Sequence, residues 1–425
     1  MAKRHTIEIQ QWDSVFRRLD ELCHANSISD SFWPVLKLSI SLVMGVPDEA
    51  SKGNSFELVR SIRDVNKVLE YIDKNWPGTI PEKPKHFEMS ESLFESCMHE
   101  LKQIDFQNAN LEFMDSLFER LMQRSNKGEK GQFFTPRHVV EACVRVAQTK
   151  STHQVADIAC GSGAFLTKSI QLQDNVEVNF PDTNVWGFDI DLKAMAVAKL
   201  SLIALGRNPD QIIFADSLVK NGTKNLGANA NRISIEGIML QMLPTFEGFD
   251  FILTNPPFAG EFTDQEALEA YKLYRPGRKN ERDVLFIERS VDLLKPGGVL
   301  AIVVPTNKLG GAQFEFVREF ILKSMRVFGV LSLPRETFTP HTAQKTEIIF
   351  AVKRDQPLVS VDVTEEIVFV ISEKPGKDKR GNFIFREGQS LNGNAWDSLD
   401  HDLQDAMPVL VAAKDKALAE MGFER

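Results

Sequence analysis

The stretch "FILTNPPFAG" (251–260) combines residue types that could hold an amino group rigidly. An apolar run stops at the amide Asn255, and two prolines and a phenylalanine follow. Pro256 restricts Asn255 to extended conformations, Pro257 restricts Pro256 in the same way, and each proline fixes its own φ. An ordinary turn would explain the prolines, but the motifs upstream favour a binding pocket.

A glycine turn lies upstream of this stretch. "VADIACGSGAFLTKSI" (155–170) has the pattern of a strand, a turn and a helix. Gly161 and Gly163 allow the backbone to pass close to a ligand at the carboxyl end of the strand. Leu166 stands where a dinucleotide-binding GxGxxG motif has its third glycine, which disfavours a pyrophosphate ligand. A plain tight turn remains an alternative.

Acidic residues end the next two predicted strands. Asp189 closes the second strand in "GFDID", where a doubly wound fold places a carboxylate on a ribose diol. Asp216 follows the third strand in "FADSL" and could accept a hydrogen bond from an adenine amine. Either aspartate could instead cap a helix. Three consecutive strand ends with such groups favour one nucleoside-like ligand.

The elements that must position these residues alternate between strands and helices. Early apolar runs are typical of strands buried on both faces of a parallel sheet. The alternation predicts right-handed βαβ units in a doubly wound α/β fold, with an antiparallel end because a short non-helical stretch joins the last two runs. The predicted strands are 155–158, 185–190, 212–215, 249–254, 299–305, 327–334 and 347–352, with a further short run "EEIVFVIS" and a final helix from about 399.

The first 125 residues have helical patterns instead. In "SFELVRSIRDVNKVLEYI", Leu58, Ile62 and Val65 recur at helical spacing and predict an apolar stripe. The 425 residues suggest two or three domains. We therefore predict a helical N-terminal domain (1–125), an α/β domain (126–355) and a C-terminal tail with a short strand and a helix (356–425).

Bulk properties narrow the class of protein. A net charge of −9 argues against a protein that coats nucleic acid, although a local basic groove remains compatible with it. The four cysteines form no CxxC pair, so neither a zinc site nor a disulfide framework is expected. The start has no apolar signal core, and no apolar run approaches the ~18 residues of a membrane span. These features predict a cytoplasmic protein without a membrane partner.

The motifs together resemble a known family. "DIACGSGAFL", "GFDID", "ADSL" and "NPPF", in this order, resemble S-adenosylmethionine-dependent amino-methyltransferases. "GQFFTP" (131–136) precedes the glycine turn, as in N6-adenine DNA methyltransferases of the gamma arrangement. With "FIERSVDLLKPGGVLAIVVP" and "LPRETFTPHTAQKTEIIF", the set is most similar to the modification subunit of type I restriction-modification systems. The resemblance covers about 125–352.

The resemblance implies a Rossmann-like methyltransferase sheet behind a helical N-terminal domain, and methyl transfer from S-adenosyl-L-methionine to the N6 amine of adenine in DNA. Asp189 departs from the glutamate that the family often has at the ribose position. The implied cofactor site consists of Phe133, Thr135 and Pro136 around the methionine part, Asp157 at the amino-acid end, Gly161 and Gly163 at the close approach, Asp189 at the ribose, Asp216 at the adenine, and Asn255 beside them.

For such a reaction the NPPF motif has a chemical role. The exocyclic amine of adenine is a weak nucleophile that must pyramidalise as it attacks. The side-chain oxygen of Asn255 and the carbonyl of Pro256 could accept its two hydrogens, and Pro257 helps to keep both acceptors preorganised. Phe258 offers a face on which a flipped base can stack. These four residues are the predicted catalytic set, and the mechanism needs no metal.

A basic segment follows the motif closely. "YKLYRPGRKNERD" (271–283) carries Arg275, Arg278, Lys279 and Arg282. We predict that these side chains contact DNA phosphate or close over the substrate. A solvated loop is the alternative interpretation.

A DNA-recognition domain is missing from this organisation. Such a domain would need ~100 residues or more, whereas about 28 separate Phe258 from Phe286 and the tail after 352 has about 70. Sequence specificity is therefore expected from a separate DNA-specificity subunit, with the N-terminal helices and the tail as docking segments. The resemblance makes double-stranded DNA the substrate and is compatible with a nuclease or translocase subunit and a second copy of this chain.

Two other functions fit parts of the pattern. An amino-methyltransferase that acts on RNA or on a protein glutamine also uses NPP followed by an aromatic residue, usually tyrosine; "GQFFTP" favours DNA. A non-catalytic scaffold could keep the fold without the chemistry, and the intact Asn255 argues against it.

Overall fold

The structure is a computed structural model that describes residues 6–47, 56–80, 87–103, 134–174, 184–220, 233–389 and 394–423. The chain divides into two compact units. One comprises Met1–Glu129, Leu192–Asp210 and Glu387–Ser398, and the other comprises Lys130–Asp191, Gln211–Arg386 and Leu399–Arg425. In the described residues, no helix combines the length and the apolar character needed to cross a bilayer.

The second unit is built on an eight-stranded sheet with the order β10-β8-β9-β7-β6-β3-β4-β5. Its strands coincide closely with the predicted runs, and the predicted doubly wound fold is confirmed. The strands are β3 (Val155–Asp157), β4 (Val185–Asp189), β5 (Ile212–Phe214), β6 (Phe249–Thr254), β7 (Leu294–Pro305), β8 (Met325–Ser332), β9 (Thr346–Lys353) and β10 (Val368–Ile371).

All strands of this sheet except β9 run in the same direction. β9 lies between β7 and β8 and is antiparallel to both, and β10 pairs in parallel with β8. The predicted antiparallel end is therefore a single reversed strand inside the sheet. The ends of β3, β4, β5, β6 and β7 meet at one side, which we call the carboxyl edge. In doubly wound sheets, ligands bind in the crevice at this edge.

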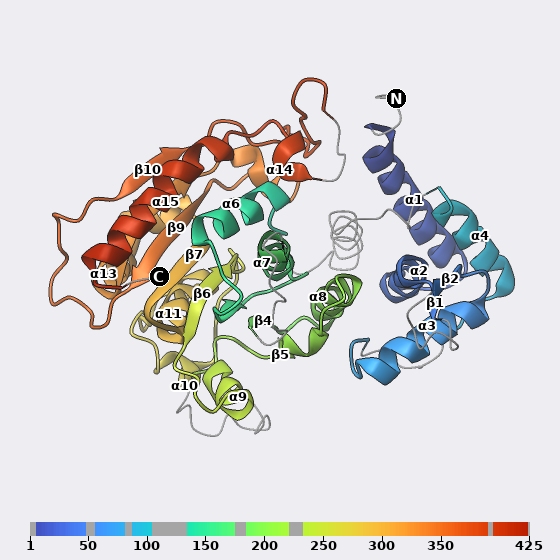
Figure 1. The fold of residues 1–425 in the computed structure, drawn as a ribbon, viewed down its shortest axis with the longest axis horizontal. Coiled ribbons are helices and arrows are strands. Elements are labelled where there is room, and N and C mark those ends of the chain that lie inside the picture. The colour runs from blue at the N-terminus through green and yellow to red at the C-terminus, as the bar shows by residue number, and fades with distance from the viewer. Residues whose placement is uncertain are drawn as a thin grey trace. The chain divides into compact units, whose positions relative to one another are not determined.

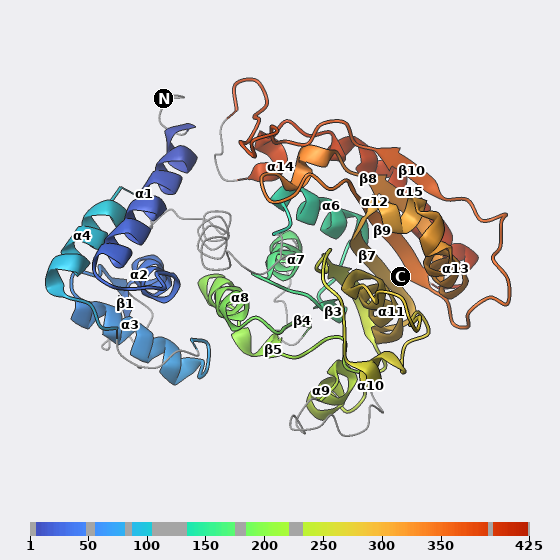
Figure 2. The same ribbon diagram turned by 180° about the vertical axis from the view of Figure 1, so that it is seen from behind.

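Helices cover both faces of the sheet (Figures 1 and 2). The face covered by α6, α7 and α15 is opposite the face covered by α11 and α13. These helices are α6 (Arg137–Ala147), α7 (Ala164–Asp174), α11 (Arg282–Leu293), α13 (Glu315–Ser324) and α15 (Leu403–Glu420). Short helices α9 (Ile235–Met242), α10 (Gln265–Leu268) and α12 (Thr306–Gly310) lie in the connections. The core includes almost wholly buried side chains from β4, β6, β7 and α11, together with others from β3, β8, β9, α9 and α13.

The first unit is helical, as predicted, with one short addition. Strands β1 (Val46–Pro47) and β2 (Phe56–Glu57) form an antiparallel pair of two residues each. The helices are α1 (Thr6–Ala25), α2 (Phe32–Met44), α3 (Ile62–Asn75), α4 (Glu91–Leu101), α8 (Leu192–Ala204) and α14 (Ala395–Ser398). α1 packs against α4, and α2 packs against α3.

Two predicted helices begin later than expected. Ser61 caps α3: its hydroxyl accepts a hydrogen bond from the Asp64 N–H, and the Asp64 carboxylate accepts one from the Ser61 N–H. This capping box starts the helix at Ile62, so Leu58 lies outside the stripe and is 60% exposed. The final helix α15 begins at Leu403, because Leu399 instead forms an extended bridge with Phe385.

Candidate active site

The carboxyl edge brings NPPF together with the "FTP" stretch and the first strand. The side-chain amide of Asn255, directly after β6, donates from Nδ2 to Thr135 Oγ1 at 2.9 Å. The preceding residue, Thr254, donates from Oγ1 to Asp157 Oδ1 at 2.7 Å. Three segments that are far apart in the sequence therefore meet through two hydrogen bonds.

The glycine turn leaves room for a ligand. Gly161 and Gly163 have φ angles of 51° and 79°, in the left-handed region that glycine adopts without strain. The Gly161 N–H donates to the Asp189 carboxylate at 2.9 Å. A Cβ atom added at Gly161 would meet no other atom within 4 Å, so a ligand can approach the backbone there.

Asp157 is a buried acid at this edge. Its carboxylate accepts hydrogen bonds from Thr254 and from the Ala159 N–H, the latter at 3.1 Å. Burial raises the pKa of Asp157 to about 7, and the nearby Asp189 adds to the rise while the two hydrogen bonds oppose it. A buried carboxyl of this kind gains a favourable partner when a cationic amino group binds beside it.

The other two predicted acids lie at the ends of the neighbouring strands. Asp189 also accepts from the Asp191 N–H at 2.9 Å, and burial raises its pKa. Asp216 accepts from the Leu218 N–H at 3.1 Å within a turn, and no helix begins there in the described residues up to 220, so Asp216 is not a helix cap. The residues on either side of Asp216 bind the ends of β4 and β3: Ala215 donates to the Asp189 carbonyl, and Ser217 donates to the Ile158 carbonyl. The predicted trio is thus gathered at one edge.

Ile190 was missed in the sequence. It follows Asp189 directly and leaves 53% of its surface exposed. An exposed apolar side chain next to the three acids offers a surface for one face of a flat ring. The signal was available, since an apolar residue after the strand-ending acid has no core to fill.

Phe258 presents little surface. The ring is 6% exposed and meets Phe338 edge to face, with ring centroids 5.6 Å apart. Stacking of a base on Phe258 therefore requires the covering segments to move, and this predicted role stays a prediction. Phe338 comes from "LPRETF", between β8 and β9, and was not identified as a site residue from the sequence.

The "FTP" stretch is anchored at the start of α6. Pro136 is the residue before this helix, and Arg137 donates to Thr167 Oγ1 of α7 at 3.4 Å. α7 starts directly after the glycine turn, so Thr135 and Pro136 lie near that turn as predicted. Phe133, the third residue predicted here, lies outside the described residues.

The predicted DNA-contacting side chains differ in their surroundings. Arg275 is built into its own loop: Nη1 donates to the carbonyls of Lys272 and Tyr274, both at 2.8 Å. Arg278 and Lys279 are exposed at the tip of the loop. Arg282 is exposed and packs beside Gly260. The structure thus separates one structural arginine from three open cations.

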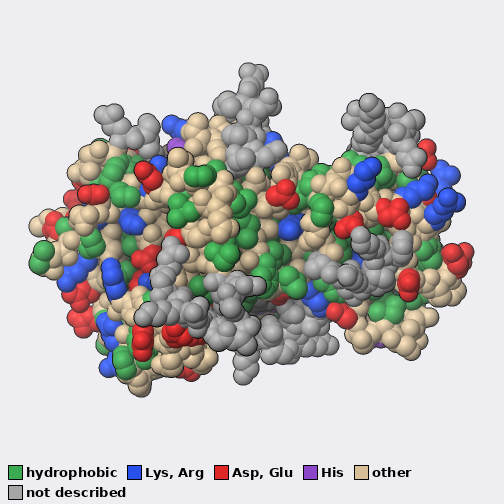
Figure 3. All heavy atoms as spheres, turned by 90° about the horizontal axis from the view of Figure 1, so that it is seen from below, with side chains coloured by type: hydrophobic (Ala, Val, Ile, Leu, Met, Phe, Trp, Pro, Cys, Tyr) green, Lys and Arg blue, Asp and Glu red, His purple; other side chains and the backbone are tan. Residues whose placement is uncertain are grey.

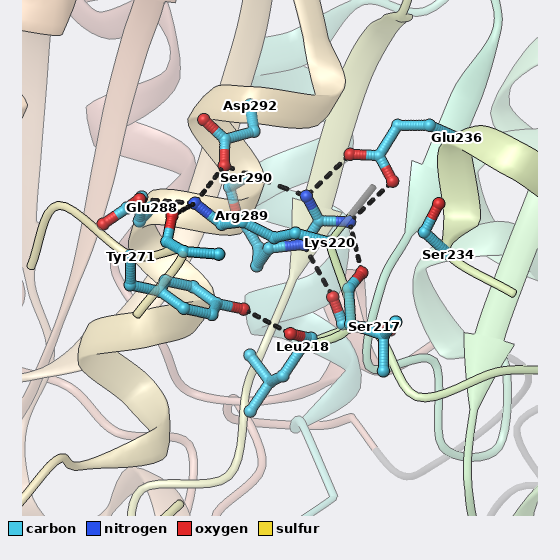
Figure 4. A network of polar contacts seen from close by, with 12 residues as sticks. Ser217, Leu218, Lys220, Ser234, Glu236, Tyr271, Glu288, Arg289, Ser290 and Asp292 are labelled. Carbon is cyan, nitrogen blue, oxygen red and sulfur yellow. Dashed lines mark hydrogen bonds and ion pairs between the residues drawn. The ribbon is translucent and has the colours of Figure 1, made fainter. Parts of the chain in front are cut away.

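A buried polar network holds the loop after β5, which carries Asp216 (Figure 4). Arg289 of α11 is fully buried and binds Glu236 through two hydrogen bonds of 2.7 and 2.9 Å. Its guanidinium also donates to the carbonyls of Ser217 and Val219. Burial alone would raise the pKa of Glu236, but the hydrogen bonds and the charge of Arg289 lower it.

The same network reaches the start of the arginine-rich loop. Glu288, the neighbour of Arg289, accepts from the backbone N–H groups of Lys272 and Leu273 at 2.9 and 2.8 Å. Tyr271 donates from its hydroxyl to the Leu218 carbonyl at 2.7 Å. The loop after β5 and the loop after β6 are therefore tied to one helix.

The sequence of this chain is similar to those of known methylase subunits. The methylase subunit of the type I restriction enzyme EcoEI from Escherichia coli is 24% identical over 292 residues, which cover 66% of this chain and 56% of that protein. The corresponding MpnII subunit from Mycoplasma pneumoniae is 24% identical over 305 residues, 68% of this chain and 52% of that protein. The chain spans about half the length of these curated relatives.

A solved structure shares the fold. The type I restriction-modification methyltransferase subunit from Streptococcus thermophilus superposes with a TM-score of 0.59 at 15% identity, over 95% of this chain and 93% of that chain. The family model for N-6 DNA methylases matches residues 109–391, well over half of the chain. The predicted family is therefore confirmed: this chain belongs to the N-6 DNA methylases.

Proposed function

We propose that this chain transfers a methyl group from S-adenosyl-L-methionine to the N6 amine of adenine in DNA. It would do so as the catalytic modification subunit of a type I restriction-modification complex. The observation that carries the proposal is the Asn255–Thr135 hydrogen bond, which fixes the amide of NPPF at the carboxyl edge beside Asp157. Family membership supports the reaction class.

Asn255 orients the acceptor amine. Because Nδ2 donates to Thr135, the plane of the amide is fixed, and its oxygen is the hydrogen-bond acceptor presented by that plane. The Pro256 carbonyl provides a second acceptor, whose direction is set by Pro257. Two fixed acceptors favour the pyramidal amine without reorganisation during the reaction. A neutral amide suits this role, since a carboxylate would stabilise the sulfonium charge before transfer more than during it.

The residues at the carboxyl edge fit the cofactor. The open space at Gly161 would let the cofactor approach the backbone, Asp157 would offer a carboxylate to its amino group, Asp189 would hold its ribose, and Asp216 and Ile190 would contact its adenine. Phe133, Thr135 and Pro136 would flank its methionine part. When bound, S-adenosyl-L-methionine supplies an electrophilic methyl group; Asn255 and Pro256 hold the amine in line with it.

We propose three parts of the chain: a helical N-terminal domain (1–125), the methyltransferase domain (126–355) and a C-terminal tail (356–425). The first and the third would serve docking in the complex. The chain would work in the cytoplasm with double-stranded DNA and a DNA-specificity subunit, and its complex could include a nuclease subunit and a second copy of this chain.

Transfer of tritiated methyl from the cofactor to unmethylated genomic DNA tests the proposal. The assay is run with and without the products of the neighbouring genes, and the labelled base is then identified. The proposal predicts labelled N6-methyladenine only when a specificity subunit is present. Label in RNA or protein, or cofactor binding without transfer in the full complex, would contradict it. Methylation of one defined sequence by the chain alone would contradict the separate specificity subunit.

A further inference from the structure

The arginine-rich loop encloses a cavity of about 380 Å³. We call it the arginine-loop pocket, and it is lined by residues from 273–285 and 313–316. Its volume lies within the range of ~300–1,000 Å³ found for small-molecule sites. The first stretch leads from the loop after β6 into α11, and the second follows β7, so both belong to the carboxyl edge.

The walls of this pocket are apolar and aromatic. Phe314 and Phe316 contribute rings, and Leu273, Val284 and Leu285 contribute aliphatic groups. The Arg275 guanidinium lies 4.4 Å from the centre of the Phe316 ring, and Lys308 Nζ lies 4.1 Å from that of Phe314. Because these cations rest on the rings, the aromatic walls are held in place.

The rim of the pocket is cationic. Arg278 and Lys279 are exposed there, and within the described residues neither side chain makes an ion pair or a hydrogen bond. The carboxylate in the lining, Glu281, is paired with Lys308. On the face shown in Figure 3, Lys and Arg side chains are scattered among Asp and Glu, so that face is not uniformly basic.

The pocket is coupled to NPPF through the backbone. The Phe262 N–H donates to the Asn280 carbonyl at 2.9 Å, and the Arg282 N–H donates to the Gly260 carbonyl at 3.2 Å. Glu261 and Glu281 pair as an antiparallel bridge. The segment after Phe258 therefore runs along the loop that forms the pocket. A nucleic acid with one nucleotide at Asn255 could place another nucleotide in this pocket.

We propose that the arginine-loop pocket binds one nucleotide. Its base packs against the partly exposed ring of Phe316, and its phosphate binds Arg278 and Lys279 at the rim. A ring-lined cavity with cations at its mouth suits a flat heteroaromatic group joined to an anion. The nucleotide could belong to the substrate DNA, next to the target adenine, and in that case the inference rests on the proposed function. A free nucleotide has the same chemistry and would bind the same groups.

Equilibrium binding to the full-length chain tests this site. The probes are a fluorescent single-stranded 12-mer, the same sequence as a duplex, unlabelled dAMP as competitor, and inorganic phosphate. Replacement of both rim cations (Arg278→Ala with Lys279→Ala) should weaken oligonucleotide binding about tenfold or more and flatten its salt dependence. The matched control replaces two adjacent exposed cations on another loop (Lys379→Ala with Arg380→Ala) and should bind as the wild type does.

Phe316→Leu tests the base contact separately. It keeps an apolar wall but removes the ring, and it should weaken oligonucleotide binding about tenfold. Competition by dAMP that is lost in the rim variant identifies a single nucleotide as sufficient. If the oligonucleotide binds and is weakened by the rim and Phe316 variants, but dAMP does not compete, the site belongs to the DNA strand.

Equal binding by the rim variant and its control would overturn the proposal, as would inorganic phosphate that competes as well as dAMP. All binding measurements are repeated in an Asn255→Ala background, so that methyl transfer cannot affect oligonucleotide binding. A wild type that binds through the pocket but methylates nothing even with the specificity subunit present would refute the proposed function and leave the pocket. A wild type that methylates DNA while the rim variant binds normally would refute the pocket alone.

Discussion

In the half of the carboxyl edge formed by β3, β4 and β5, the acidic side chains bind backbone amides from nearby turns. Asp157 and Asp216 each bind an N–H group two residues away, and Asp189 binds Gly161, 28 residues away. In the half that follows β6 and β7, Asn255 binds Thr135 across 120 residues, and Phe258 meets Phe338. We call these the cofactor half and the acceptor half.

The difference separates what is local from what depends on the whole fold. In the cofactor half, a strand and its turn supply most of the partners of its acid, and the exception is Asp157, which also accepts from Thr254 of β6. The cofactor half therefore depends less on distant segments. The acceptor half exists only when distant segments are correctly packed. The following variants, from the largest expected effect to the smallest, test whether the halves are as separable as their hydrogen bonds suggest.

Arg289→Leu should damage both halves. It leaves Glu236 without its buried partner and releases the carbonyls of Ser217 and Val219, and breaking such a pair lowers the free energy of unfolding by about 3 kcal/mol or more. Chemical denaturation measures the loss. Glu319→Ala, which breaks an exposed pair with Lys323, should leave stability nearly unchanged because solvent screens that pair. A small effect of Arg289→Leu would show that the network does not hold the two loops.

Asn255→Ala should break the acceptor half alone. Loss of a preorganised acceptor lowers kcat by about 100- to 1,000-fold, while S-adenosylmethionine still binds nearly as in the wild type. Single-turnover methyl transfer and calorimetric titration of the cofactor measure the two effects. If transfer and cofactor binding fall together, Asn255 has a structural role and the separation fails.

Asp189→Ala should break the cofactor half alone. A hydrogen bond to a charged group contributes about 1.5–3 kcal/mol, so the cofactor Kd should rise by about 10- to 100-fold. Transfer at saturating cofactor should recover most of the wild-type rate. A rate that stays low at saturation would show that the carboxylate also positions the acceptor half.

Cofactor binding should depend on pH through Asp157. Since burial raises the pKa of Asp157 to about 7, the free protein holds this group protonated below pH 7, and a cationic amino group must displace that proton. Affinity should fall by up to about tenfold per pH unit below 7 and level off above it. Calorimetry from pH 5.5 to 8.5 measures the slope, and Asp157→Asn should abolish it.

The same pKa has an opposite effect on the free protein. The folded pKa lies above the unfolded value near 3.8, so the contribution of Asp157 to stability is fully present below that value and is lost as the pH rises through 7. Without cofactor, the wild type should therefore lose stability relative to Asp157→Asn as the pH rises from about 4 to about 7, and the difference should level off above 7. The charged neighbour on this side is Asp189, and its variant serves as the control for a shared titration.

Thr135→Val should have the smallest effect. It removes one hydrogen bond to the Asn255 amide, worth about 1 kcal/mol, so kcat should fall by about fivefold. Thr135→Ser keeps the hydroxyl and should restore the rate. If valine and serine behave alike, the hydroxyl does not orient Asn255.

Sequence and structure agree best in the cofactor half. Gly161, Gly163 and the strand-ending acids were predicted because each signal is complete within a few residues. The partner of Asn255 was placed near the cofactor in the sequence analysis, but its hydrogen bond was not, since only the packed α6 and β6 bring the two residues together. Leu58 was assigned to a helix because periodicity carries no information about the capping box at Ser61.

Charge patterns proved ambiguous for a similar reason. Four basic side chains in one loop were predicted to act alike, yet Arg275 binds carbonyls of its own loop while Arg278 and Lys279 extend from it. Glu288 and Arg289 have no local signature of their use. Which arginine is structural depends on carbonyl groups that only the folded backbone supplies.

The strand order also sets the order in which this edge can be completed during synthesis. β3, β4 and β5 come from residues 155–214, so most partners of the cofactor half leave the ribosome together. The central position beside β3 is filled only by β6, and the reversed strand β9 inserts between β7 and β8 after residue 346. A nascent chain that has reached residue 250 thus has most partners of the cofactor half but neither Thr254 nor Asn255, and Phe338 emerges later still.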